Sequence, residues 1–501
     1  MAKWKEQLAK PYAWWVHQRN LQWKLRAAEV QQEWLLKLCQ KAASTQFGID
    51  HHLKEVRTTK DFTEAVPIRD YEMLRSYVDV MVDGKSDVLW PGRPLYYAKT
   101  SGTTSGAKYI PISKESMPFH IESAKEALLE YAFHSGNYDY IGGKMIFLQG
   151  SPEMTETHGV KTGRLSGIVA HYVPAYLQAN RLPSWETNCI DDWETKLAAI
   201  VQETKAQDMR LISGIPPWVQ MYFEHLIKAT GVDFVSELFP KFSLFVTGGV
   251  NYEPYRATID QLVGRSVDML ETYPASEGFI AYNDFSGEEG LLLLANHGIY
   301  YEFVPLEEVH EERPTRLSLA EVQKGQRYAI LLTTNAGLWS YLIGDTIEFV
   351  SLRPYRIKVT GRIAHYISAF GEHVIGSEVE WAMEKACSVT GCRVLEFTVA
   401  PQVNPAEGAP YHEWFVAFDQ EPEDLDVFMH VLDMALREKN TYYNDLIKGK
   451  ILRECVVHHV ARDLFANYMK SIGKLGGQNK LPRLSNDRKM ADVLLQMMTA
   501  H

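Results

Sequence analysis

Cysteine is scarce in this sequence. Five cysteines occur among 501 residues, which is an odd number, and no two of them form a C-x-x-C pair. Small disulfide-stapled domains and structural zinc sites depend on paired or clustered cysteines, so this pattern argues against both. The usage is typical of a reducing compartment, and we expect the protein to be cytoplasmic. The cysteines are Cys39, Cys189, Cys387, Cys392 and Cys455.

Long apolar runs and an excess of positive charge are also absent. The purest aliphatic run, Leu291–Leu294, is far shorter than the ~18 residues that a membrane span needs. The sequence opens without the apolar stretch of a secretory signal. Lysine and arginine number 52 against 63 acidic residues, so the net charge is −11. Sequence-independent binding of nucleic acid needs a strong basic field. We therefore expect neither a membrane nor a nucleic-acid partner.

Several common catalytic signatures are missing as well. No two glycines stand at a G-x-G spacing, which excludes the dinucleotide-binding fingerprint. The sequence contains no G-x-S-x-G nucleophile elbow and no H-E-x-x-H metal motif. The functions that depend on these motifs are thereby removed from consideration.

The order of apolar segments predicts an α/β protein. The length favours two or three packed units, and the first fifty residues carry a helical pattern. Between about residues 95 and 350, short β-type runs alternate with longer amphipathic stretches, and the last ~140 residues suffice for a smaller α+β domain. The expected strands of the larger part are Lys144–Leu148, Phe242–Thr247, Val267–Thr272, Leu291–Leu294, Tyr328–Thr333 and Thr346–Val350. Its expected helices are Ser113–Ala132, Asp191–Gln207 and Pro216–Ala229.

The most unusual segment is rich in hydroxyl groups and glycine. Residues 100–106 read T-S-G-T-T-S-G, and Lys108 follows closely. Glycines allow successive backbone N–H groups to converge, and hydroxyls add further donors, which suits polyphosphate oxygens. The spacing differs from that of a Walker A loop. Taken alone, the segment is equally consistent with a flexible surface turn.

Two carboxylates follow predicted strands or turns. Glu277 lies in Y-P-A-S-E-G at the end of an expected strand, where an α/β domain binds ligands. Asp345 lies in a glycine turn before another expected strand. In isolation, a solvated turn glutamate and an ordinary hairpin turn are the simpler interpretations.

In this order and spacing, the segments resemble the acyl-adenylate-forming superfamily. The series is T-S-G-T-T-S-G-x-K, then T-Y-x-A-S-E, then Y-x-x-G-D, then G-R-I-A-H-Y-I-S-A-F-G-E at residues 361–372. Within the superfamily, the chain looks like the GH3 family of acyl acid amido synthetases, of the bacterial type. The A-F-G-E segment and the near-terminal G-G-Q-N-K-L-P-R at residues 476–483 favour GH3 over the acyl-CoA synthetases. The resemblance covers essentially the whole chain.

The resemblance implies two domains: an N-terminal adenylation domain over residues 1–355 and a smaller, mobile α+β domain over residues 356–501, with a hinge near residues 361–370. The family's C-terminal domain rotates between two half-reactions. This sequence departs from the superfamily pattern at the hinge, where Ala364-His365 replaces a common acidic residue and Ser368 a common lysine. Leu342 stands where plant relatives carry an arginine.

The resemblance also implies a nucleotide site that uses ATP and Mg²⁺. Lys108 and Lys480 are the expected catalytic cations, and Glu277 is the expected Mg²⁺ ligand. Asp345 is expected to accept both ribose hydroxyls, while Tyr273 and Ser276 lie against adenine and the α-phosphate. The remaining residues expected at the nucleotide are Thr100, Ser101, Gly102, Thr103, Thr104, Thr247, Gly248, Gly249 and Arg362.

By the same resemblance, the expected function is an ATP-dependent acyl acid–amino acid ligase that forms an amide through an acyl-AMP intermediate. Its expected partners are a small carboxylic acid and an amino acid. Two alternatives stay open: an adenylating enzyme that transfers the acyl group to a thiol, such as coenzyme A or a carrier protein, and a non-catalytic relative that binds a nucleotide. The sequence does not identify the acid.

Overall fold

The chain forms two compact units. The computed structural model describes residues 2–101, 107–172, 178–190, 193–248, 252–363, 366–367, 374–403, 405–448, 452–476, 480–485 and 487–499. The larger unit comprises Met1–Tyr252 and Ile259–Val359, and the smaller comprises Glu253–Thr258 and Thr360–His501. Across the described parts of the chain, no helix combines the length and the apolar character that a membrane crossing requires.

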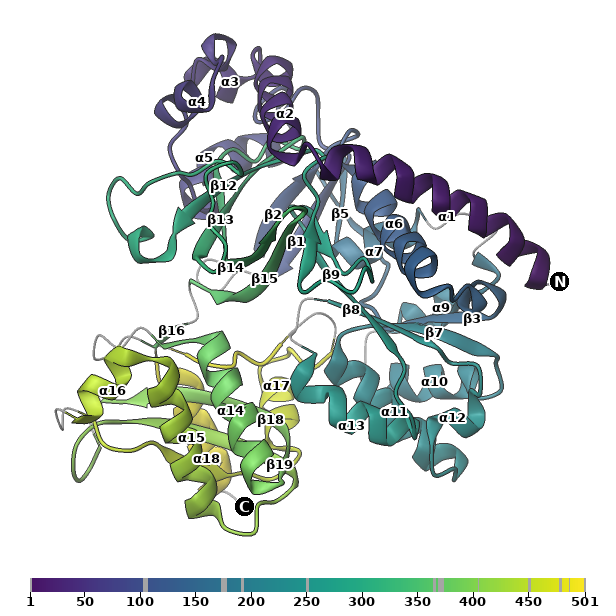
Figure 1. The fold of residues 1–501 in the computed structure, drawn as a ribbon, viewed down its shortest axis with the longest axis vertical. Coiled ribbons are helices and arrows are strands. Elements are labelled where there is room, and N and C mark those ends of the chain that lie inside the picture. The colour runs from purple at the N-terminus through teal and green to yellow at the C-terminus, as the bar shows by residue number, and fades with distance from the viewer. Residues whose placement is uncertain are drawn as a thin grey trace. The chain divides into compact units, whose positions relative to one another are not determined.

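The larger unit contains a sheet of eleven strands (Figure 1). Strands β6, β3, β7, β8 and β9 pair in parallel, whereas β10, β11, β12 and β13 pair antiparallel with their neighbours. The sheet is therefore parallel at one end and antiparallel at the other. From edge to edge the strands are β12 (Ile299–Pro305), β13 (Arg327–Thr334), β14 (Tyr341–Leu352), β15 (Tyr355–Arg362), β11 (Leu291–Leu293), β10 (Gly278–Tyr282), β9 (Asp268–Ala275), β8 (Leu244–Gly248), β7 (Met209–Ser213), β3 (Lys144–Phe147) and β6 (Arg181–Leu182).

A second sheet of the larger unit has four strands in the order β2-β1-β5-β4. Strands β1 and β2 pair antiparallel, and β1 also pairs in parallel with β5. Residues 102–106 connect β1 to β2, so the hydroxyl-rich segment joins the two strands of a β-hairpin. The strands are β1 (Tyr96–Ser101), β2 (Ala107–Ile112), β5 (Val160–Gly163) and β4 (Thr155–Thr157).

Some helices begin or end where the local sequence provides a cap. Helix α5 follows Asp70, whose side chain accepts the backbone amide of Met73 at 2.9 Å. Helix α6 ends at Gly136, which adopts the left-handed conformation that glycine tolerates best. The helices of the larger unit are α1 (Ala2–Lys24), α2 (Ala27–Ala42), α3 (Gln46–Asp50), α4 (Thr59–Ala65), α5 (Tyr71–Val82), α6 (Met117–Ser135), α7 (Leu165–Ala170), α9 (Trp185–Asn188), α10 (Trp193–Thr204), α11 (Pro216–Thr230), α12 (Val235–Leu238) and the second half of α13 (Glu253–Val263), from Ile259 on.

The smaller unit has a three-stranded sheet with an apolar core on each face. Alternate residues of β19 face opposite sides, as the pleat of a strand requires. Trp414 and Val416 belong to the core that includes α14 and α15, whereas Phe415 and Ala417 belong to the core that includes α17 and α18. Its elements are β16 (Tyr366–Ile367), β17 (Val374–Ile375), α14 (Gly376–Thr390), β18 (Arg393–Gln402), β19 (Tyr411–Gln420), α15 (Leu425–Lys439), α16 (Thr441–Lys448), β20 (Val456–His459), α17 (Leu464–Ser471) and α18 (Lys489–Thr499).

The predicted α/β fold class is confirmed. Each of the six expected strands overlaps an observed one, and the three expected helices correspond to α6, α10 and α11. One expectation was wrong: Thr346–Val350 was predicted to begin after a glycine turn, but β14 already starts at Tyr341. Several strands of the larger unit were not predicted, among them β1, β2, β7, β10, β12 and β15.

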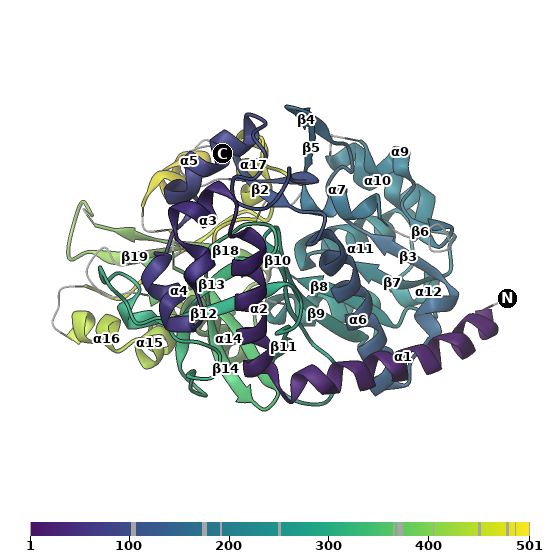
Figure 2. The ribbon, with the colours of Figure 1, turned by 90° about the horizontal axis from the view of Figure 1, so that it is seen from above.

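Helix α1 is held to the rest of the larger unit by buried charges. It runs beside α6 (Figures 1 and 2), and Lys24 near its end lies 3.4 Å from a Glu130 oxygen and 3.3 Å from an Asp284 oxygen. Arg356 contacts both oxygens of Asp284, at 2.7 and 2.9 Å. Burial alone would raise the pKa of Asp284, but the charges of Lys24 and Arg356 outweigh it and lower the pKa. The charges of two cations and two carboxylates thus neutralise one another in the buried interior: Lys24, Arg356, Glu130 and Asp284.

We predict that Asp284→Ala lowers the free energy of unfolding by about 3–5 kcal/mol, because it leaves Arg356 and Lys24 buried with too little negative charge. The matched control is Glu289→Ala, which removes the exposed partner of Lys358 and should change the free energy of unfolding far less, because solvent screens an exposed ion pair. Denaturant unfolding of both variants measures the difference. Equal effects would contradict a structural role for the buried cluster.

Candidate functional site

Two predicted site residues lie where β8 reaches the carboxyl end of the parallel strands, the edge at which α/β sheets bind ligands. Gly248 pairs with Thr272 of β9, and a Cβ atom on Gly248 would lie only 2.3 Å from the Thr272 carbonyl oxygen. Only glycine therefore fits at this position. The neighbouring Thr247 hydroxyl is buried, and within the described ranges it has no hydrogen-bond partner. Such an orphaned polar atom at a strand end is suited to a polar ligand.

The next strand presents the second group of predicted residues. Tyr273 lies in β9 and is buried. Strands β9 and β10 form a hairpin in which Ala275 pairs with Gly278, so Ser276 and Glu277 are the two residues of its turn. Both are half-buried. The turn thus projects a carboxylate at the same edge of the sheet as Gly248.

The sequence had predicted that Asp345 lies in a turn before a strand. In the structure it lies within strand β14. Ala329 of β13 pairs with Thr346 of β14, but Leu331 pairs with Leu342, so β14 carries two extra residues at this point. The excess forms a β-bulge, and Gly344 within it has a φ of +91°. Bulges of this kind change the direction in which a side chain points and are common next to binding sites.

A hydrogen bond joins two of the predicted motifs directly. The Tyr273 hydroxyl donates to an Asp345 carboxylate oxygen at 2.5 Å. Strands β9 and β14 are four positions apart in the sheet, which corresponds to about 19 Å in a flat sheet at about 4.8 Å per strand. Because two side chains do not span that distance, the antiparallel end of the sheet must curl until β14 faces β9.

The hydroxyl-rich segment is described only at its two ends. In the hairpin, Thr100 pairs with Lys108 and Ser101 pairs with Ala107. Lys108 is half-buried, and its Nζ atom lies 5.6 Å from the centre of the Tyr71 ring. The predicted residues Gly102, Thr103, Thr104 and Gly249 lie outside the described residues.

A segment that the sequence had not indicated links this hairpin to the strand of Asp345. Arg69 exchanges backbone hydrogen bonds with β14: its N–H donates to Ser340 at 3.2 Å, and its carbonyl accepts from Leu342 at 2.8 Å. Two residues later, the Tyr71 hydroxyl accepts the Tyr109 amide at 2.8 Å. Burial raises the pKa of Tyr71, so this hydroxyl stays neutral. Lys108 and the bulge of β14 are therefore attached to the same short segment.

The remaining predicted residues belong to the smaller unit. Arg362 is the last residue of β15 and is exposed, and Lys480 is also exposed. In the expected hinge, Ala364, His365 and Ser368 lie outside the described residues. The structure thus joins Tyr273 to Asp345 and places Gly248, Ser276 and Glu277 at the same edge of the sheet, while Arg362 and Lys480 are described only within their own unit.

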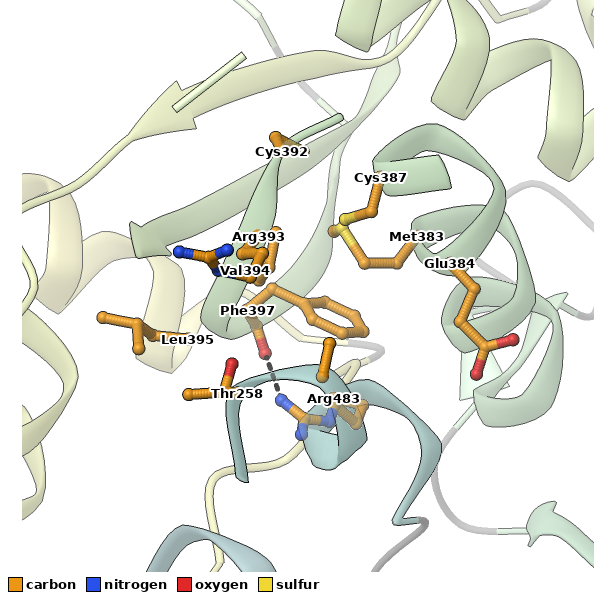
Figure 3. A pocket seen from close by; sticks show the side chains of 11 residues that line it. Thr258, Met383, Glu384, Cys387, Cys392, Arg393, Val394, Leu395, Phe397 and Arg483 are labelled. Carbon is orange, nitrogen blue, oxygen red and sulfur yellow. Dashed lines mark hydrogen bonds between the residues drawn. The ribbon is translucent and has the colours of Figure 1, made fainter. Parts of the chain in front are cut away.

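The smaller unit also contains a pocket (Figure 3). Arg483 is one of its lining residues, and its guanidinium donates to the Phe397 carbonyl at 3.4 Å. None of the predicted site residues lines it. Its walls are formed by Ala257, Thr258, Met383, Glu384, Cys387, Cys392, Arg393, Val394, Leu395, Phe397 and Arg483.

Comparison with known families shows three consecutive matches. The GH3 family N-terminal domain matches residues 18–215, the central domain matches residues 292–362 and the C-terminal domain matches residues 377–489. Together these matches account for most of the sequence. The chain belongs to the GH3 family. The predicted family is thereby confirmed.

Among curated GH3 relatives, the jasmonoyl–L-amino acid synthetase GH3.5 of Oryza sativa subsp. japonica is 20% identical over 94% of this chain and 95% of its own length. The jasmonoyl–L-amino acid synthetase JAR4 of Nicotiana attenuata is 23% identical over 64% of this chain and 66% of its own length, just under two thirds of the relative. Both names describe amide synthetases, the class of enzyme predicted from the sequence.

Solved structures share the fold. The AtGH3.15 acyl acid amido synthetase superposes with a TM-score of 0.80 at 15% identity, covering 96% of this chain and 95% of that one. A 2-hydroxyisobutyryl-CoA ligase bound to an acyl-AMP superposes with a TM-score of 0.62 at 12% identity, covering 94% of this chain and 92% of that one. The GH3 chain therefore has the fold of adenylate-forming enzymes.

We predict that Gly248→Ala destabilises the larger unit by about 1–3 kcal/mol, because the new methyl group meets the backbone of β9 and forces the two strands apart. Gly150→Ala is the matched control: Gly150 is buried and Gly248 is half-buried, but the Cβ at Gly150 would meet only the flexible Arg164 side chain, at 3.1 Å. Thermal unfolding of both variants tests this, and an equal shift in Tm would contradict the close approach of β8 to β9.

Proposed function

We propose that this GH3 protein is an ATP-dependent acyl acid–amino acid ligase that forms an amide through an acyl-AMP intermediate. The observation that carries the proposal is the hydrogen bond between Tyr273 and Asp345, beside the orphaned Thr247 hydroxyl. It brings a carboxylate, an aromatic ring and an unused polar group together at the carboxyl end of the parallel strands. This combination suits a nucleoside, which offers ribose hydroxyls and a flat base.

The proposed site divides the nucleotide among these groups. Asp345 accepts hydrogen bonds from the ribose hydroxyls, for which a carboxylate has the acceptor capacity. Thr247, Gly248, Gly249, Tyr273 and Ser276 border the base and the α-phosphate. The hairpin segment of Thr100, Ser101, Gly102, Thr103 and Thr104 holds the outer phosphates.

The charged residues complete the site. Lys108 pairs with Thr100 close to the connecting segment of the hairpin and contributes a cation next to the outer phosphates. Glu277 would hold Mg²⁺, which prefers carboxylate oxygens and phosphates as ligands. Arg362 and Lys480 are contributed by the smaller unit. Bound Mg²⁺ supplies positive charge where the phosphoryl oxygens become more negative.

An amine does not readily attack a carboxylate. The first half-reaction therefore activates the acid. The carboxylate oxygen of the acid bonds to the α-phosphorus of ATP, and the bond to pyrophosphate breaks, leaving acyl-AMP. Negative charge spreads over the phosphoryl oxygens in this transition state, so cationic side chains there contribute most to the rate. We assign this role to Lys108 and Lys480.

In the second half-reaction, an amino acid nitrogen attacks the acyl carbonyl and AMP leaves. The names of two relatives support an amine acceptor, because both are jasmonoyl–L-amino acid synthetases. The attacking amine releases a proton in this step.

The proposal extends to domain roles and location. We assign adenylation to residues 1–355, a mobile domain to residues 356–501 and the hinge to residues 361–370. Leu342, in place of the arginine of plant relatives, supports the bacterial type. The scarcity of cysteine supports a cytoplasmic location, and all five cysteines are free thiols.

We predict that the protein exchanges pyrophosphate into ATP in the presence of a carboxylic acid, and that Glu277→Ala reduces this exchange by at least about 100-fold through loss of charge stabilisation. Exchange of labelled pyrophosphate across a broad panel of acids is the measurement. Glu289→Ala removes an exposed carboxylate and serves as the control with unchanged exchange. A wild-type protein that binds ATP but stays silent across the panel is instead a nucleotide-binding relative without turnover.

We predict further that amino acids, and not coenzyme A, accelerate AMP release once an acid that supports exchange is known. Mass spectrometry of the product should show an amide. Lys480→Ala should slow adenylation by about 10²–10³-fold, because one contact to the developing charge is lost. Stimulation by coenzyme A alone, with a thioester as product, would contradict the amide synthetase.

A further inference from the structure

Helices α1 and α6 bring together three metal-ligating side chains, two histidines and one glutamate, none of which belongs to the proposed nucleotide site. His17 is contributed by α1, and Glu130 and His134 lie one turn apart on α6. One ligand atom from each, namely two imidazole nitrogens and a carboxylate oxygen, lies within 4.8 Å of the other two. The group is assembled by tertiary packing, because His17 and Glu130 are 113 positions apart in the sequence.

The distances approach those of a tetrahedral metal site. A Glu130 oxygen, Oε2, lies 2.9 Å from His17 Nδ1 and 3.5 Å from His134 Nε2. Ligand atoms around tetrahedral zinc lie about 3.3–3.4 Å apart, given metal–ligand bonds of about 2.0–2.1 Å. Side-chain adjustments of about an ångström are therefore enough to place an ion among the three atoms.

The surrounding residues hold the ligands in place. The other Glu130 oxygen, Oε1, accepts from Asn20 at 2.9 Å and from Lys24 at 3.4 Å. The His17 ring stacks on Phe133 with 4.1 Å between the ring centres. Lys24 therefore contacts Oε1, and the other oxygen, Oε2, faces the two histidines. Metal-binding carboxylates and histidines are typically oriented by such outer contacts.

Access and helix polarity also favour a cation. The Glu130 side chain is fully buried, whereas those of His17 and His134 are 13% and 22% exposed. An ion could thus enter from the solvent side and keep a water molecule as its fourth ligand. His134 lies in the last turn of α6, where the helix dipole favours positive charge.

We propose that His17, Glu130 and His134 form a zinc site that fastens α1 to α6. Two imidazoles and one carboxylate are ligands that zinc shares with other late transition metals, whereas Mg²⁺ and Ca²⁺ require more oxygen ligands. The site is distinct from the proposed Mg²⁺ position at Glu277 and does not depend on the proposed reaction. The competing explanation is that both histidines only donate hydrogen bonds to Glu130.

The test is calorimetric titration of the full-length protein with Zn²⁺ in the absence of ATP. We expect one equivalent to bind and the Tm to rise. His134→Ala should weaken binding by at least about 10–100-fold, the loss found even when only an outer contact of a metal ligand is removed. Its partial exposure makes this variant suitable for folding, and His17→Ala should act in the same way. The control is His52→Ala, which removes an exposed histidine beside Glu55 and should leave binding unchanged.

Cobalt(II) provides a second readout that does not depend on stability. A tetrahedral site with nitrogen ligands should produce intense visible absorption at one equivalent of Co²⁺, and His134→Ala should abolish it. Absence of saturable binding by the wild type, or equal binding by wild type and His134→Ala, would overturn the proposal and leave the histidines as hydrogen-bond donors.

Discussion

The architecture of the site depends on the contact between Tyr273 and Asp345. A 2.5 Å hydrogen bond between strands four positions apart requires a strongly curled sheet. Three features of the chain permit it: the two-residue bulge in β14, the left-handed Gly344 within that bulge, and the brevity of β11. The parallel pairing of β7, β8 and β9 is regular, so the carboxyl ends of these strands provide a fixed edge against which the curled part closes. The groups proposed to bind the nucleotide meet along that edge.

Much of this arrangement could be predicted from the sequence. Alternating apolar runs indicated an α/β fold, and the order of short motifs indicated the GH3 family; both are confirmed. Each of these motifs is local, because its glycine, hydroxyl and acidic residues lie at fixed spacing within a dozen positions. Such a motif can be recognised directly in the sequence. The roles of Lys108, Glu277 and Lys480 remain predictions, because they concern a bound nucleotide.

What the sequence did not indicate is non-local or depends on backbone detail. Asp345 was expected in a turn because glycine precedes it, yet the pairing of β13 with β14 makes the same glycine a bulge within a strand. The bridging role of Arg69 and Tyr71 arises from contacts with residues 38 or more positions away. Partners this far away along the chain cannot be predicted from a local sequence pattern. The acyl pocket is unassigned for the same reason, since its walls come from separate elements.

The ionic attachment of α1 has a consequence for biogenesis. Lys24 leaves the ribosome early, but its partner Asp284 and the arginine that completes the cluster, Arg356, are synthesised hundreds of residues later. At roughly 5–20 residues per second, this delay is on the order of tens of seconds. Until then Lys24 lacks the Asp284 carboxylate and the Arg356 guanidinium that complete its buried charge cluster. Helix α1 is thus synthesised well before the distant charges that hold its lysine in the folded unit.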